Sequence, residues 1–212
     1  MRYFETSFSV ALSSVLILIM LPQFAVAQQQ DDTQWRQTVQ VLTTVEDDGA
    51  TGAFLDSLVA VVERENMEVM RSEDNEARTS FAQLEDEILS EGVDFSSANR
   101  VFISYKFEAG RRGFRTVIED MYFIYRPESG ADMDISIMYV DLTQPELMNL
   151  LYNSGMQLRT NEVALVPFHE QLQFHNLNDS ELVALGGDII RDEHEAERER
   201  QRVLRTVRNF LY

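Results

Sequence analysis

Between residues 100 and 141 apolar side chains recur at every second position, and this pattern restricts the fold more than any other feature. In RVFISYKFE, the residues Val101, Ile103, Tyr105 and Phe107 alternate with more polar neighbours. The stretches FRTVIEDMYFIYR and MDISIMYVD are also rich in β-branched and aromatic residues. A period of two is typical of strands, because successive side chains point to opposite faces. The connectors AGRRG and PESGAD are turn-like, so we predict three consecutive antiparallel strands.

Apolar residues outside this region recur at helical spacing, which predicts helices on both sides of the strands. N-terminal helices are expected within residues 33–91, and an inserted helix is expected at TQPELMNLLYNSG. In the inserted helix Thr143 and Glu146 have the spacing of a capping box. The apolar residues that mark the three N-terminal helices are Trp35, Val39 and Leu42, then Phe54, Leu58, Val61, Val62 and Val69, and finally Phe81, Leu84 and Ile88.

The last third of the chain predicts one more strand and a long helix. The fourth strand is expected at about 162–175, and helix is expected from Asp179 or Ser180, with an interruption at the Gly-Gly pair. The final helix is expected over 188–212. The predicted fold class is therefore α+β, with N-terminal helices, a mainly antiparallel four-stranded sheet that carries one inserted helix, and a long C-terminal helix.

Residues 1–27 are typical of an export signal. The apolar run from Val10 to Leu21 is shorter than the ~20 residues that a membrane-spanning helix needs. Ala25 and Ala27 stand at the −3 and −1 positions of a cleavage site. We expect a flexible N-terminus at 28–32 after cleavage, no transmembrane span, and a periplasmic or extracellular location in a bacterial envelope.

Composition restricts the function of the expected single domain, 28–212. The chain contains no cysteine, which excludes disulfides, thiolate nucleophiles, iron–sulfur clusters and cysteine-type zinc sites. Its net charge of −18 would be repelled by phosphate backbones, so we expect no nucleic-acid partner. Lys106 is the only lysine among 18 basic residues, a bias that either a high-salt habitat or a GC-rich genome explains. The sequence does not indicate an oligomeric state.

The stretch HEQLQFH resembles a zinc-protease motif only at its start. His169 and His175 are six residues apart, and Gln173 occupies the position at which a second histidine would share a helical face. In a strand the two histidines would lie roughly 20 Å apart. In neither geometry can the two histidines bind the same metal ion, so we predict a strand with two surface histidines. We expect no metal and no cofactor.

Two sets of charged residues are candidates for a functional site. Lys106, Arg111, Arg112 and Arg115 surround the predicted GRRG turn and form either a solvated hairpin tip or an anion or partner contact. Asp120 and Asp134 are candidate catalytic carboxylates. If both are buried, the raised pKa of one would allow it to act as an acid while the other acts as a base. Glu119 cannot pair with Asp120 in a regular strand, because neighbouring side chains point to opposite faces. A pair of Asp120 with Asp134 requires a matching register.

An apolar stripe ends the C-terminal helix and packs either on its own domain or on a partner. It consists of Val203, Leu204, Val207, Phe210 and Leu211.

The sequence thus favours an exported, non-enzymatic envelope protein that binds a protein partner or a small apolar ligand in a sheet–helix cavity or at this helix end. The alternatives are a small hydrolase or isomerase with a cavity carboxylate, and an accessory subunit of an envelope complex.

Overall fold

The computed structural model describes residues 33–73, 77–111, 113–127, 133–159 and 163–211. The predicted export signal (1–27), the expected flexible N-terminus (28–32) and Arg112 lie outside the described residues. Within the described part, no helix combines the length and apolar character that crossing a membrane requires.

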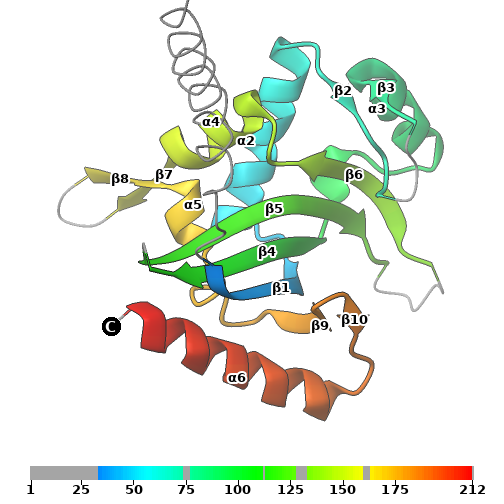
Figure 1. Cartoon of the computed structure of the whole chain (residues 1–212). Coiled ribbons are helices and arrows are strands. Elements are labelled where there is room, and N and C mark those ends of the chain that lie inside the picture. The colour runs from blue at the N-terminus through cyan, green and yellow to red at the C-terminus, as the bar shows by residue number, and fades with distance from the viewer. Residues whose placement is uncertain (1–32, 74–76, 112, 128–132, 160–162, 212) are drawn as a thin grey trace, which may run out of the picture. The chain divides into compact units, whose positions relative to one another are not determined.

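A curled antiparallel sheet of six strands forms the centre of the described fold, in the order β10-β9-β1-β4-β5-β6 (Figure 1). The mixed α+β class is confirmed, whereas the predicted four-stranded sheet is wrong. Beside the three predicted strands β4, β5 and β6, the sheet contains β1, β9, which pairs with β1, and β10, which pairs with β9. The strands of this sheet are β1 (Thr33–Thr44), β4 (Arg100–Gly110), β5 (Gly113–Tyr125), β6 (Ile135–Asp141), β9 (Glu181–Leu185) and β10 (Asp188–Ile189).

Helices and two small hairpins complete the described fold. The helices are α2 (Ala50–Arg64), α3 (Phe81–Ser90), α4 (Pro145–Asn153), α5 (Phe168–Gln171) and α6 (Glu193–Leu211), with a short 3₁₀ turn at Phe95–Ser97. The small hairpins pair β2 (Glu68–Val69) with β3 (Thr79–Ser80), and β7 (Gly155–Arg159) with β8 (Val163–Pro167).

One face of the large sheet forms the hydrophobic core. The alternating residues of β4, including Ile103, Tyr105 and Phe107, are fully buried on this face, and Phe123 of β5 joins them. Helix α2, the segment 168–177 and α6 pack against this side, since all contribute buried residues to one cluster. Alternation therefore places a solid apolar layer on one face and leaves the half-buried, polar residues of β4 on the other.

The three-stranded meander is confirmed, because β4 pairs with β5 and β5 pairs with β6. The helices predicted around Phe54, Phe81 and TQPELMNLLYNSG are also present as α2, α3 and α4. The predicted capping box at Thr143 does not form. Gln144 is the N-cap of α4, and the Thr143 hydroxyl instead donates to the Asp141 carboxylate at 2.6 Å.

The helix predicted around Trp35, Val39 and Leu42 is wrong, because these residues belong to β1. A spacing of four places Trp35 and Val39 on one side of a helix and equally on one face of a strand. Val41, which is also fully buried, follows the strand period of two. Pairing with β9 on one side and β4 on the other determines the outcome, and sequence periodicity does not contain that information.

The strand predicted at 162–175 is wrong beyond Pro167. Strand β8 pairs only with β7, and HEQLQFH begins inside the helical turn α5. Phe168 and Leu172 are both buried four residues apart, which suits a helical turn as well as a strand.

The helix predicted from Asp179 or Ser180 is also wrong, because β9 occupies 181–185 and pairs with β1. Gly186 and Gly187 both have positive φ, 64° and 93°, and they form the turn that leads into β10. Such a turn is typical of tight hairpins, since glycine adopts left-handed backbone without strain. The C-terminal helix is confirmed but begins at Glu193, not at residue 188.

Candidate functional site

An apolar depression lies where the start of β1, the tip of the β4–β5 hairpin and the end of α6 meet. We call it the aromatic pocket, and its volume is about 280 Å³. Its walls come from three distant parts of the chain, so only the folded protein assembles it. The lining residues are Gln34, Trp35, Ala109, Gly110, Gly113, Phe114 and Phe210.

Three aromatic rings determine the character of the aromatic pocket. The Phe210 ring lies 5.5 Å from Trp35 and 5.5 Å from Phe114, and it is nearly parallel to the latter. Phe107, which is fully buried, stacks on both Trp35 and Phe114 at 6.4 and 6.1 Å. These separations are in the range of favourable aromatic pairs. The pocket is therefore an opening in a continuous stack that reaches from the core to the surface.

The predicted apolar stripe of α6 divides into two parts. Val203, Leu204 and Val207 are buried against the sheet side of the domain, whereas Phe210 and Leu211 are 45% and 48% exposed. The three buried residues attach α6 to the domain, and of the two exposed residues Phe210 lines the aromatic pocket.

The basic residues of the β4–β5 hairpin differ in how they are paired. The Nζ of Lys106 lies 3.8 Å from Oε1 of Glu108 and 3.3 Å from Oε1 of Glu119. Arg115 lies 3.7 Å from the other oxygen of Glu108. Arg111 is exposed in the turn, and no described residue forms a hydrogen bond or ion pair with it. Arg112 lies outside the described residues.

Asp120 lies on the opposite face of the sheet by regular alternation, and a β-bulge brings Glu119 to the same face. Ser104 pairs with Asp120, and Tyr105 pairs with Ile118, so Glu119 has no partner on β4. A bulge brings two consecutive side chains toward the same face. Both carboxylates consequently line one pocket, which corrects the expectation from the sequence that Glu119 and Asp120 are kept apart.

This second depression, the outer pocket, has a volume of about 270 Å³. It lies beside the β9–β10 turn, since Gly187 and Ile189 line it. The residues that line it are Thr38, Val39, Gln40, Ser104, Tyr105, Glu119, Asp120, Ala184, Gly187 and Ile189.

Burial raises the pKa of Asp120 to about 6. A hydrogen bond from Ser104 opposes the shift, while the nearby charges of Glu73, Glu119 and Asp141 reinforce it. Across the strands Asp120 pairs with Asp141, and not with Asp134. The environment of Asp120 thus favours its protonated form at mildly acidic pH, below about 6.

Asp134 has a different environment. Its carboxylate accepts two hydrogen bonds from Arg126, at 2.8 and 2.7 Å. This contact lowers the pKa of Asp134. A paired, exposed carboxylate of this kind is a structural ion pair, and the two predicted carboxylates do not meet.

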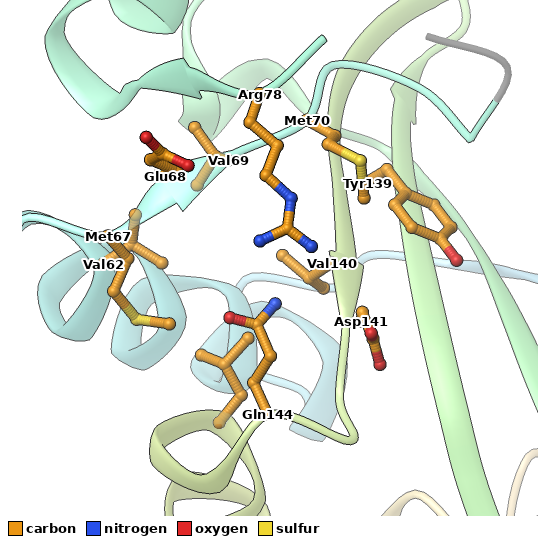
Figure 2. A pocket seen from close by; sticks show the side chains of 11 residues that line it. Val62, Met67, Glu68, Val69, Met70, Arg78, Tyr139, Val140, Asp141 and Gln144 are labelled. Atoms are coloured by element: carbon orange, nitrogen blue, oxygen red, sulfur yellow. The ribbon is translucent and has the colours of Figure 1, made fainter. Parts of the chain in front are cut away.

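A third depression lies between α2, the β2–β3 hairpin and β6. Figure 2 shows the Arg78 side chain extending into it toward Gln144, with Val62 and Met67 on the side of α2. Its enclosed volume is about 10 Å³, which is room for about one water molecule. The side chains fill this space, so it offers no ligand site.

The two histidines of HEQLQFH have different neighbours. The ring of His169 packs against Tyr152 at 4.5 Å. Burial and the charge of Arg208 lower the pKa of His175. Among the described residues, no three His, Asp or Glu side chains are grouped in a way that would hold a metal ion.

In comparisons with known proteins, neither a family model nor a curated protein matches the chain.

Proposed function

We propose that the chain is an exported binding protein of the bacterial envelope that holds an apolar group in the aromatic pocket. The observation that supports this proposal most is the half-exposed Phe210 ring, which forms a wall of the pocket together with Trp35 and Phe114. A concave apolar surface of this kind is typical of binding sites.

The lining chemistry favours binding over catalysis at this place. None of the side chains that line the aromatic pocket ionises near neutral pH, and Gln34 is the only one with a polar side chain besides the indole of Trp35. General acid–base chemistry needs a titratable group within hydrogen-bond reach of the substrate. Removing an aromatic ring from water contributes about 1.5–3 kcal/mol. An apolar group that covers Phe210 therefore gains free energy from desolvation alone.

Trp35 offers a direct test because it is the only tryptophan in the chain. Titration of the full chain with 1-octanol, a neutral apolar probe, should change the Trp35 fluorescence saturably. The variant Phe210→Ala should bind octanol at least about fivefold more weakly, since the loss of ring contact costs about 1 kcal/mol or more.

Met148→Ala is the matched control, because Met148 is 44% exposed on a different helix. Its octanol affinity should equal that of the unmodified chain. A linear, unsaturable fluorescence response, or equal binding by Phe210→Ala, would exclude the aromatic pocket as the binding site.

A small hydrolase with its carboxylates in the outer pocket is the second candidate. The observation in its favour is the bulge, which brings Glu119 to the same pocket as Asp120. The Nζ of Lys106 lies 3.3 Å from the Glu119 carboxylate. Two carboxyl groups in unlike environments are suited to acid and base roles. Hydrolysis of nitrophenyl esters or glycosides by the full chain, lost in Asp120→Asn and retained in Asp86→Asn, would support this candidate. A chain without such activity leaves only the binding proposal.

A further inference from the structure

We propose that the aromatic pocket takes a small amphipathic carboxylate, with its apolar part against Phe210 and its carboxylate at Arg111. This inference rests on the proposed binding function and names the class of ligand.

Arg111 directly follows Gly110, a lining residue of the aromatic pocket, and is exposed in the hairpin turn. Gly110 and Gly113, which flank the Arg111 turn, both line the pocket. Gly113 has a φ of +117°, a backbone conformation that glycine adopts without strain, and the space around its α-carbon is open. An arginine side chain that starts between these two glycines is long enough to reach a group bound in the pocket.

The charges around the hairpin leave Arg111 available to a ligand. Glu108 already has three basic neighbours, because Lys106, Arg115 and Arg36 lie within 3.8, 3.7 and 3.1 Å of it. Arg111 forms no hydrogen bond or ion pair with the residues that the structure describes. The pocket thus combines an apolar wall with an unpaired guanidinium, in a chain whose net charge is −18.

Guanidinium chemistry and pocket size define the ligand class. A guanidinium presents a planar pair of N–H donors that matches the two oxygens of a carboxylate. The volume of about 280 Å³ is just below the roughly 300–1,000 Å³ of pockets for drug-sized ligands. One ring or one short alkyl chain fits this volume, whereas the two chains of a bilayer lipid do not.

Three probes of equal chain length test the inference: octanoate, 1-octanol and octylammonium, each followed by Trp35 fluorescence of the full chain at pH 8 and low salt. Octanoate should bind about tenfold more tightly than octanol, since a charge-assisted hydrogen bond is roughly twice as strong as a neutral one. Octylammonium should bind most weakly. The preference for octanoate should decrease as salt screens the charge.

Two variants on the same hairpin assign the anion contact. Arg111→Gln should reduce octanoate binding to the level of octanol and leave octanol binding unchanged. Arg115→Gln, whose arginine is already paired with Glu108, should keep the full preference.

The outcomes separate this inference from the proposed function. Equal affinities for octanol and octanoate, or an Arg111→Gln variant with undiminished preference, would overturn the carboxylate inference and leave the apolar pocket intact. No binding of any of the three probes would overturn both. A peptide with a C-terminal phenylalanine that binds where octanoate does not would overturn the small-molecule ligand in favour of a protein C-terminus.

Discussion

The hydroxyl of Tyr105 donates a 2.7 Å hydrogen bond to the main-chain carbonyl of Leu172, inside the hydrophobic core. Tyr105 is fully buried on β4, and burial raises its pKa far above the usual value. This bond connects the sheet to the segment after α5, which covers the sheet in place of the strand that the sequence predicts. A buried hydroxyl in this position satisfies a carbonyl that would otherwise have no partner.

Tyr105→Phe should therefore destabilise the fold. The variant leaves the Leu172 carbonyl without its donor, which costs about 1–3 kcal/mol of unfolding free energy. Urea denaturation measures the loss. Tyr122→Phe is the control, since the half-buried Tyr122 hydroxyl bonds to Ser136 where water can replace it. A Tyr105→Phe loss no larger than that of Tyr122→Phe would contradict this role.

Asp120 should make stability depend on pH. Its folded pKa of about 6 exceeds the ordinary value of 3.8, so the folded chain binds this proton more tightly than the unfolded chain. The contribution is fully present below pH 4 and is lost as pH rises through about 6. Asp120→Asn should remove this dependence and raise stability at pH 8 by about 2 kcal/mol.

Thermal and urea unfolding between pH 4 and 8 measure this effect as the difference between variant and unmodified chain. The difference is needed because the large net negative charge also lowers stability as pH rises. Asp86→Asn, at an exposed position on α3, should show no such change between pH 4 and 8. A constant Asp120→Asn difference over this range would refute the raised pKa.

Arg200 should be important for the attachment of α6. Its Nη2 donates to the carbonyls of Leu177 and Asn178 at 2.9 and 3.1 Å, and the residue is buried. Arg200→Met keeps the apolar stem but removes both donors, and should lower the unfolding free energy by about 1–2 kcal/mol. Arg198→Met, at an exposed position on the same helix, should change it by less than about 0.5 kcal/mol. Equal effects of both variants would show that these bonds contribute nothing.

Two truncations should separate stability from binding. A chain that ends at Asn209 loses only the exposed end of α6, so it should unfold cooperatively but no longer bind octanol. A chain that ends at Arg202 also loses Val203, Leu204 and Val207, all buried. Burial of each contributes about 1.5–3 kcal/mol, so their loss should remove most of a typical domain stability. Calorimetry and Trp35 fluorescence report the two effects. A stable, cooperative 1–202 chain would show that the buried stripe is dispensable.

The local sequence pattern was sufficient to predict an element wherever its apolar residues recur with a single period. The alternation from Val101 to Phe107 predicts β4, and the apolar residues around Phe81 predict α3. At the N-terminus of α3, Ser80 and Gln83 form a capping box within four residues. Such interactions depend only on neighbours along the chain, so a sequence contains all the information that determines them.

The aromatic pocket and the outer pocket could not be predicted from the sequence, because residues that are distant along the chain form them. Trp35, Phe114 and Phe210 belong to β1, β5 and α6, and no local spacing relates them. Their only signal in the sequence was the apolar end of the C-terminal helix. Glu119 reached the outer pocket through a bulge, which strand pairing creates and strict alternation does not predict.

The sequence by itself determined the antiparallel meander, the helices α2, α3, α4 and α6, and the acidic, cysteine-free character of the chain, because periodicity and composition are local or additive properties. Only the tertiary structure decided that β1 and β9 are strands and that HEQLQFH begins in a helical turn. It also decided that the apolar stripe of α6 is partly buried and partly exposed. The physical reason is that apolar residues four apart suit a helix face and a strand face equally. Long-range pairing and burial then select one of the two.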